Sequence, residues 1–399
     1  MEESEAGLVV IREFKPSKDV ARVEELERSC EVGAAGKMSI LTDDLGDPLN
    51  RIRHSPSYLM LVAEIGSEIV GIIRGCIKTV TCGKKLARST NAAPRAVPVC
   101  TKTAYLLGLR VSPRHRRLGV GLKLVQKMED WFEENGVEYA YMATESENEP
   151  SLNLFTRKCG YTKFRTPCIL VNPVHAHRVR ISTRISIHKL TSSEAELLYR
   201  RRLATTEFFP RDIDAVLKNK LNLGTFVSAP SGYFWAGLEK FLSDPPESWA
   251  VVSVWNNNEV FKLEVRGASS VRKGLIRATR AVDRTCPWLG IPSVPDFFKP
   301  FGLHLLYGWG SEGPQARQMV RALCNHAHNL ARKSGCGAVV TEVSGHDPIR
   351  SAIPHWKSLS CEEDVWCIKR LGEGYSDGSV GDWTKSPPGI SIFVDPREF

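Results

Sequence analysis

The chain has 399 residues, of which 42% are hydrophobic and 25% charged, so it is long enough for two hydrophobic cores. Its net charge of +9 favours acidic partners, phosphates among them, over basic ones. The sequence lacks both a membrane-length apolar run and a secretory signal, which predicts a soluble protein. Eleven cysteines without a CxxC pair indicate reduced thiols, as expected inside cells.

The N-terminal part of the chain predicts strands and one helix. Residues 8–14 alternate as a strand does, and a helix is expected over residues 16–31. Residues 58–65 and 69–80 predict a hairpin. The stretch 82–99 is too long for a simple hairpin loop, so we expect a mobile insertion there.

The stretch LLGLRVSPRHRRLGVGLKLVQKMEDWFEENG, residues 106–136, predicts a strand, a basic loop and an amphipathic helix. Apolar residues alternate up to Val111 and then recur every three or four positions from Leu118 to Phe132. The basic loop between them ends in Gly119 and Gly121. The unpaired N–H groups and partial positive charge of a helix start can hold a pyrophosphate, and glycines let it approach the backbone. The loop therefore predicts a phosphate cradle.

Two common nucleotide-binding loops are excluded by individual residues. A P-loop needs Lys and then Ser or Thr after its last glycine, but Leu122 and Lys123 follow Gly121. A dinucleotide-binding loop needs a third glycine where Leu124 stands. The pattern that remains is R-x-x-G-x-G over residues 116–121, directly after a strand that ends in L-x-V.

Two more strands and a short helix are expected after the central helix. Residues 138–145 predict a strand parallel to the central one, because a single helix connects the two. Pro150 suits the first turn of a short helix, and residues 161–171 predict a further strand. Residues 172–186 are expected to be a linker, and a closing strand is expected over residues 389–396.

The second half of the chain repeats the first in outline. Residues 248–267 consist of a strand pattern, a polar turn, a second strand pattern and Arg-Gly, as residues 57–75 do. Residues 335–348 likewise correspond to residues 136–150, each after an amphipathic helix. We therefore predict a tandem duplication of one α/β unit, with a chance likeness between hairpins as the alternative. Glu312 stands where the first unit has arginines, which disfavours a second phosphate site.

The motif at residues 116–121 resembles the acetyl-CoA loop of the GNAT superfamily of N-acetyltransferases, and ENEPSLNLFTRKCGY at 147–161 resembles its second signature. The resemblance implies an α/β fold (α+β, with a mixed sheet): a GNAT unit over residues 1–171, the linker, and a degenerate GNAT-like unit over residues 187–399. It also implies acetyl-CoA as co-substrate and no metal. The implied cofactor-binding residues are Leu109, Val111, Arg116, Arg117, Leu118, Gly119, Val120, Gly121, Leu122 and Asn148.

The resemblance also suggests where a base would lie. Acetyl transfer needs a neutral amine, a polarised thioester carbonyl and a proton for the departing thiolate. A backbone N–H on the strand ending at Val111 can polarise the carbonyl. Glu145 is the expected base, because it shares a strand face with Ala143, where some GNAT members carry one; a solvated strand end is the alternative. Tyr105 lies where other members have a glutamate.

The usual acid for the departing thiolate is absent, because Phe155 stands where the family usually has a tyrosine. We expect Tyr161 or Tyr141 to replace it, or water to protonate the thiolate. An acyl-enzyme through Cys76 or Cys159 is a weaker alternative, since neither has a histidine beside it. The two cysteines and two histidines within residues 324–336 have the wrong spacing for a common zinc site.

Over nearly its whole length the chain is similar to the plant Hookless-type N-acetyltransferases, in segments such as RIRHSPSYLMLVAEIG, TTEFFPRDID and GDWTKSPPGISIFVDPREF. This resemblance implies a protein of the nucleus, with the cytoplasm as a second location, that influences differential growth under ethylene, auxin and light control. It implies histone or other protein lysines as acceptors. A small amine acceptor and a regulatory acyl-CoA-binding module with little catalysis remain open alternatives. We expect no direct nucleic-acid binding and no membrane association.

Overall fold

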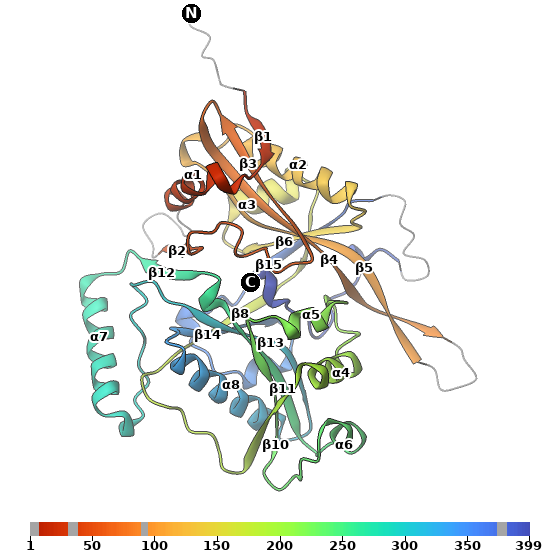
Figure 1. The fold of residues 1–399 in the computed structure, drawn as a ribbon, viewed down its shortest axis with the longest axis vertical. Coiled ribbons are helices and arrows are strands. Elements are labelled where there is room, and N and C mark those ends of the chain that lie inside the picture. The colour runs from red at the N-terminus through yellow and green to blue at the C-terminus, as the bar shows by residue number, and fades with distance from the viewer. Residues whose placement is uncertain (1–7, 31–38, 89–94, 373–380) are drawn as a thin grey trace, which may run out of the picture.

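The computed structural model describes residues 8–30, 39–88, 95–372 and 381–399, which form two large sheets flanked by helices (Figure 1). The first sheet has the order β1 (Val10–Glu13), β3 (Ser57–Ile65), β4 (Glu68–Arg88), β5 (Arg95–Val111), β6 (Tyr139–Glu145), β15 (Asp364–Arg370) and β7 (Thr162–Arg165). The second has the order β8 (Pro167–Pro173), β14 (Ala338–Ser344), β13 (Leu303–Glu312), β11 (Trp249–Asn256), β10 (Asn222–Pro230) and β9 (Ile185–Leu190). A small sheet of β2 (Ser39–Asp43) and β12 (Lys262–Arg266) connects the two halves.

Helices cover both sheets (Figure 1). The first half contains α1 (Pro16–Ser29), α2 (Val120–Glu134) and α3 (Glu149–Leu152), the last continued by a π-helical turn over Asn153–Lys158. The second half contains α4 (Ser192–Arg202), α5 (Ile213–Lys218), α6 (Leu238–Ser243), α7 (Ser270–Thr285) and α8 (Ala316–Lys333). The long helices α2 and α8 each pack on one sheet, and the apolar faces that they bury form two of the cores.

Helix α2 packs tightly on the first sheet through one face. Its buried apolar residues recur every three or four positions, among them Leu124, Met128 and Phe132. Gly75 on β4 lies opposite this face, and a Cβ there would be 2.6 Å from Sδ of Met128. Glycine therefore permits the close approach of helix and sheet, which fixes the start of α2 relative to the central strands.

The two sheets have equivalent strand orders. β1-β3-β4-β5-β6 in the first corresponds to β9-β10-β11-β13-β14 in the second. In each sheet the last two of these strands are parallel, and one long helix joins them. The predicted fold class, an α/β unit with a mixed sheet followed by a second unit of the same kind, is confirmed.

Each half also contributes a strand to the sheet of the other half. β15 pairs antiparallel with β6, and β8 pairs antiparallel with β14. The single strand predicted over residues 161–171 is interrupted at Thr166, so that β7 remains in the first sheet and β8 reaches the second. The boundaries at 171 and 187 stay a prediction about folding units, but the sheets themselves are not divided there.

The hairpin predicted over residues 248–267 does not form. β11 lies in the second sheet, but β12 leaves it and pairs with β2 of the first half. β11 is therefore the equivalent of β4, whereas the predicted correspondence with residues 57–75 matches it with β3. The second correspondence is confirmed, because β14 occupies the place that β6 has in the first sheet.

Two loop predictions need correction. β4 extends to Arg88 and β5 begins at Arg95, so most of the stretch 82–99 is a long hairpin instead of an irregular insertion; residues 89–94 lie outside the described part. Long antiparallel pairing supplies the hydrogen bonds that an irregular loop would lack.

The strand predicted over residues 389–396 is also absent. Ile392 makes one isolated bridge to Glu207, and the segment otherwise packs against an aromatic cluster. This cluster lies on the face of the first sheet opposite α2 and includes Tyr141, Phe208, Trp366 and Trp383. Burial of apolar side chains such as Phe393 and Val394, and not a strand ladder, therefore holds this segment.

Candidate functional site

A wedge opens in the first sheet where β5 and β6 separate. Their parallel pairing ends at Leu106 and Met142, although both strands continue. Gly108 lies at this point with a φ of 62°, and the register between β4 and β5 shifts there. A side chain at Gly108 would lie 2.7 Å from a guanidinium nitrogen of Arg74, so only glycine fits. The facing edges of the two strands beyond this point are unpaired with each other.

A buried arginine holds the bulge in place. Arg74 donates hydrogen bonds to Glu27 at 2.8 Å, to Asp44 at 2.9 Å and to the carbonyl oxygen of Pro48 at 2.7 Å. Glu27 belongs to α1, Asp44 follows β2 and Arg74 belongs to β4. These bonds therefore connect α1 and the segment after β2 to β4. Such charge-assisted bonds in a buried position make the wedge rigid before any ligand binds.

The loop between β5 and α2 presents open backbone amides. Among the described residues, the backbone N–H groups of residues 116–122 have no hydrogen-bond acceptor. Arg117 and Gly119 have left-handed backbone conformations, with φ of 65° and 79°. Conformations of this kind turn neighbouring N–H groups to one side, as in anion-binding loops. With the partial positive charge of the α2 N-terminus, the loop fits the diphosphate of acetyl-CoA.

The predicted cofactor-binding residues take different positions around this loop. Those exposed to solvent are Arg116, Arg117, Leu118 and Gly119, whereas those buried or half-buried beneath are Leu109, Val111, Val120, Gly121 and Leu122. A Cβ on Gly121 would lie 3.4 Å from Leu154 and 3.6 Å from Val111, so a large residue would displace the helix start from the wedge. Asn148 caps α3, where its side chain accepts from the N–H of Ser151 at 3.3 Å.

Two tyrosines lie one residue before the last paired positions of β5 and β6, on the face away from α2. The ring centroids of Tyr105 and Tyr141 are 4.9 Å apart. The Tyr141 hydroxyl donates a 2.6 Å hydrogen bond to Glu398, which also pairs with Lys78 at 2.5 Å. The Tyr105 hydroxyl has no hydrogen-bond partner among the described residues. Burial raises the pKa of both tyrosines well above the ordinary value, so both remain protonated hydrogen-bond donors.

Asp364 brings a second carboxyl group to the predicted base. In the register of β15 against β6, Asp364 lies directly opposite Glu145, which is exposed at the end of β6. Burial raises the pKa of Asp364 to about 6, and repulsion from Glu145 adds to the effect. Asp364 is therefore ionised for the most part at neutral pH, yet it can take up a proton with little cost.

A third carboxyl group faces the same sheet from the second half. Glu342 on β14 accepts a 3.0 Å hydrogen bond from Nε1 of Trp366, and burial raises its pKa well above the ordinary value. Burial therefore favours its protonated form over that of a free glutamate. Sequence reasoning missed both Asp364 and Glu342, because no local signal tells that β15 pairs with β6 or that β14 comes close to Trp366.

Tyr161 lies on the other face of the sheet. It is 2% exposed, packs against Phe155 with ring centroids 5.2 Å apart, and belongs to the core beneath α2. Burial, with the nearby carboxylate of Glu129, raises the pKa of its hydroxyl well above the ordinary value. Glu129 lies about 12 Å along α2 from Gly121 at the usual helical rise. The structure does not bring Tyr161 to the wedge, which argues against its predicted role as the acid.

The other candidate chemistries find no support. Burial raises the pKa of Cys76 to about 12 and that of Cys159 to about 11, so both thiols stay protonated and are poor nucleophiles. All eleven cysteines are free thiols. Across the described residues, no group of three or more His, Cys, Asp or Glu side chains is placed to hold a metal ion. No helix in this part of the chain has the length and apolarity to cross a membrane.

The second sheet has an equivalent wedge that is closed. The pairing of β13 with β14 ends at Leu306 and Thr341, and Gly308 has a φ of 67°, as Gly108 does in β5. Here, however, Nε1 of Trp309 donates to Thr341 at 2.9 Å and so bridges the two strands. Glu312, which ends β13, accepts hydrogen bonds from Arg202 and Trp249 at 2.8 and 3.2 Å. A bridged wedge followed by a carboxylate supports the prediction that this unit holds no second acetyl-CoA.

A pocket of about 240 Å³ lies between α1, the segment after β2, and β12. Glu27 and Asp44 line it and also bind Arg74, so the pocket extends to the back of the wedge. Its carboxylates outnumber its cations, and they are Glu24, Glu27, Asp43, Asp44, Asp47 and Glu264. Five of them pair with arginines of the chain and Asp43 pairs with none among the described residues, so a small excess of negative charge remains for a cationic ligand.

Comparison with known proteins identifies the family. The sequence profile of the acetyltransferase (GNAT) family matches residues 21–161. Two proteins of Arabidopsis thaliana, "Probable N-acetyltransferase HLS1-like" and "Probable N-acetyltransferase HLS1", are 64% and 62% identical to the chain. The matches cover 98% of this chain and 99% and 100% of the relatives. "Acetyl transferase GW6a" of Oryza sativa is 41% identical, over 98% of both chains.

The fold has a likeness among solved structures as well. The crystal structure of N-myristoyltransferase of Saccharomyces cerevisiae with bound myristoyl-CoA superposes with a TM-score of 0.54. The match covers 92% of this chain and 81% of that one, at 10% sequence identity. At this identity the likeness concerns the fold alone, and it extends over both halves of the chain.

Proposed function

The chain belongs to the acetyltransferase (GNAT) family and is an acetyl-CoA-dependent N-acetyltransferase, and we propose that its acceptor is a lysine of a basic protein, histones included. The observation that carries this proposal is the concentration of carboxylates around the wedge. Glu145 and Asp364 lie at its open end, and the acidic pocket extends to its back. A lysine ammonium, flanked by the further basic residues of such a protein, is the complementary ligand.

Glu145 and Asp364 are the groups that we propose for the proton of the amine. A lysine with an ordinary pKa near 10.4 arrives charged and must lose a proton before it can attack a thioester. Glu145 is exposed at the strand end and can pass a proton to water. Asp364, with a pKa of about 6, stabilises the cation as it binds and can share the proton. We therefore propose Glu145 as general base and Asp364 as its positioning partner.

The remaining roles belong to the backbone and to Tyr105. Acetyl-CoA supplies the activated acyl group when it is bound. The amides of residues 116–122, with Arg116 and Arg117, would hold its diphosphate. A backbone N–H on the unpaired edge of β5 would donate to the thioester carbonyl. The raised pKa of Tyr105 keeps its hydroxyl protonated, so it would donate a hydrogen bond to the departing thiolate. The ordinary pKa of that thiol is near that of a cysteine. Water then provides the proton that the thiolate takes up.

The cellular role rests on the resemblance to the Hookless-type proteins. We propose that the protein acts in the nucleus, with the cytoplasm as a second location, in the differential growth of seedlings under ethylene, auxin and light. Imaging of a fluorescently tagged full chain in seedlings tests the location. Exclusion of the tagged chain from nuclei would contradict the proposal.

Mass spectrometry with isotopically labelled acetyl-CoA tests the acceptor. We expect label on lysines of core histones or basic peptides, and none on a panel of small amines such as spermidine. Glu145→Gln should lower this labelling by about tenfold or more without changing the affinity for acetyl-CoA, since base catalysis contributes about a hundredfold or more. Glu134→Gln, an exposed carboxylate at the end of α2, is the matched control. Labelling of small amines alone would contradict a protein acceptor.

A regulatory acyl-CoA-binding module is the second candidate. Phe155 favours it, because a buried phenyl ring cannot supply the proton that the usual tyrosine does. If the wild-type chain binds acetyl-CoA but labels no acceptor above the uncatalysed rate, this second function replaces the first.

A further inference from the structure

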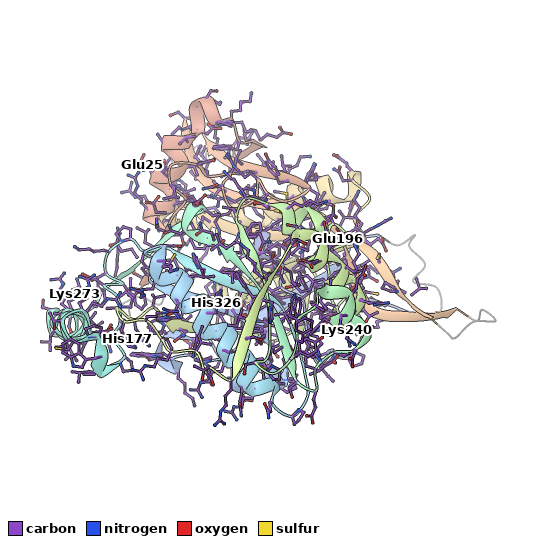
Figure 2. The ribbon with its side chains drawn as sticks, turned by 60° about the horizontal axis from the view of Figure 1, so that its bottom comes forward. Glu25, His177, Glu196, Lys240, Lys273 and His326 are labelled. Carbon is purple, nitrogen blue, oxygen red and sulfur yellow. The ribbon has the colours of Figure 1, made fainter. Side chains whose placement is uncertain are left out.

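Helix α7 and the end of α8 enclose a second cavity, in the half of the molecule that carries no acetyl-CoA loop. Its volume is about 690 Å³, and α7 lies far from α2 in the fold (Figure 1). In Figure 2, Lys273 on α7 and His177 lie at the lower left, below Glu25 on α1, and the lining of the cavity includes no residue of the loop 116–122. The cavity is therefore separate from the loop that binds acetyl-CoA.

The lining of this cavity is strongly cationic. Six basic side chains contribute to it, and they are Lys262, Arg277, Arg280, Arg284, Lys299 and Arg332. Asp296 is the one carboxylate in the lining, and it pairs with Arg277 at 3.3 Å. The carbonyl groups at the end of α8 add only about half a negative charge. The positive charge of the cavity is thus left largely uncompensated.

The side chains of three of these six cations also lack partners among the described residues. The side chains of Arg284, Lys299 and Arg332 make no ion pair or hydrogen bond to the described residues. Arg280 donates through Nη1 to the carbonyl oxygen of Val174 at 2.6 Å and to Ser293 at 3.1 Å, but its buried Nε has no partner. A buried donor without an acceptor costs stability unless a ligand supplies one.

The neighbouring carboxylate of Asp283 is used elsewhere. It is 1% exposed, accepts from the backbone N–H of Ala176 at 2.8 Å and contacts Nδ1 of His177 at 2.7 Å. Asp283 thereby fixes α7 to the segment that enters the second half, while Arg280 and Arg284 on the same helix line the cavity. The fold holds the cations together, while the carboxylate of Asp283, next to them on α7, forms its hydrogen bonds outside the lining.

We propose that this cavity binds a small, multiply phosphorylated ligand. Several guanidinium groups around one space match phosphate oxygens in charge and in hydrogen-bond geometry. The volume suits a small molecule. Lys262 and Pro300 line both this cavity and the acidic pocket. The bound polyphosphate would therefore lie next to the pocket that we propose for the acceptor. This binding site is independent of the acetyl-transfer reaction and of the identity of its acceptor.

Calorimetric titration of the full chain with inositol hexakisphosphate tests the proposal. At low ionic strength we expect one site, whose affinity falls as salt is added. The double variant Arg284→Glu, Arg332→Glu should bind about tenfold or more weakly, because two attractive charges become repulsive. Arg321→Glu, an exposed change on α8 outside the cavity, should leave the affinity unchanged. Thermal unfolding and the binding of acetyl-CoA should be the same in all three proteins.

Four results with soluble ligands would overturn the proposal. They are the absence of heat with the wild-type chain, equal affinities in the three proteins, displacement of the probe by excess acetyl-CoA, and tighter binding of a short DNA duplex with the same dependence on Arg284 and Arg332. Displacement by acetyl-CoA would assign the probe to the loop at residues 116–122. Tighter DNA binding would assign the surface to nucleic acid. Binding to vesicles with phosphoinositide headgroups is measured as well. Binding to these vesicles without binding of the soluble probe would also contradict the proposal.

Discussion

The hydroxyl of Tyr141, on the central sheet of the first half, donates a 2.6 Å hydrogen bond to Glu398, next to the C-terminal residue. The same carboxylate pairs with Lys78, and the adjacent Arg397 pairs with Asp395 and Asp212. The end of the chain is therefore locked into the face of the sheet that borders the wedge. Tyr141 is part of this lock, and its hydroxyl is already committed to a partner.

Replacement of Tyr141 by phenylalanine should destabilise the fold. A hydrogen bond to a charged, buried group contributes about 1 to 3 kcal/mol, and its loss leaves the Glu398 carboxylate with fewer donors. Urea unfolding followed by tryptophan fluorescence measures the change. Tyr58→Phe, at a tyrosine that is 41% exposed, should change the free energy of unfolding by less than about 0.5 kcal/mol. Equal effects of the two variants would mean that the C-terminal lock does not stabilise the protein.

The raised pKa of Asp364 predicts a pH-dependent effect on stability. Its folded-state pKa of about 6 lies above the ordinary 3.8, so its contribution is fully present below pH 3.8 and is lost as the pH rises through 6. Asp364→Asn should therefore stabilise the protein at pH 7.5, by at most about 3 kcal/mol. The gain should vanish near pH 4. Asp130→Asn, at an exposed position, should change stability little at either pH.

The ionisation of Asp364 should also affect the rate of acetyl transfer. Because a protonated Asp364 can neither attract the amine nor share its proton, we expect kcat/KM to fall below about pH 6. In Asp364→Asn this acidic limb should disappear and the rate on the plateau should be lower. An unchanged limb in the variant would assign the titration to another group.

Substitution of Gly119 should weaken acetyl-CoA binding. The left-handed φ of 79° costs a side-chain-bearing residue about 1 to 2 kcal/mol, and a branched side chain would also occupy the cradle. We expect Gly119→Val to raise the Kd for acetyl-CoA by about tenfold or more in calorimetry. Gly66→Val is the matched control, because Gly66 has a φ of 59° and equally open surroundings in the β3–β4 turn. A similar loss in both variants would point to general destabilisation instead of a local contact.

The reciprocal strand exchange predicts the behaviour of a fragment. Residues 1–171 lack β15, which lies between β6 and β7, so an isolated first half would expose the edge of β6 and leave β7 without its partner. We expect this fragment to be aggregated or to lack cooperative unfolding by circular dichroism. Co-expression with residues 172–399 should restore a soluble complex. A monomeric, cooperatively unfolding fragment would contradict the interdependence of the two halves.

Sequence reasoning identified the part of the site that local chemistry encodes. The basic loop at residues 116–121 and the parallel strands on either side of α2 follow from periodicity and glycine placement over a short stretch. The pattern also indicated that Glu312 sets the second unit apart. By contrast, the role predicted for Tyr161 stays a prediction against which its place in the core beneath α2 argues, because a sequence motif does not state on which face of a sheet a residue lies.

The sequence alone therefore determined the fold class, the basic loop for which we propose phosphate binding, and the presence of two related units, since these depend on patterns within about thirty residues. Only the tertiary structure decided that β15 joins β6, that Asp364 faces Glu145, and that six cations surround one cavity. Pairing between distant strands is governed by burial and by the docking of whole sheets, and neither leaves a trace in the local order of residues.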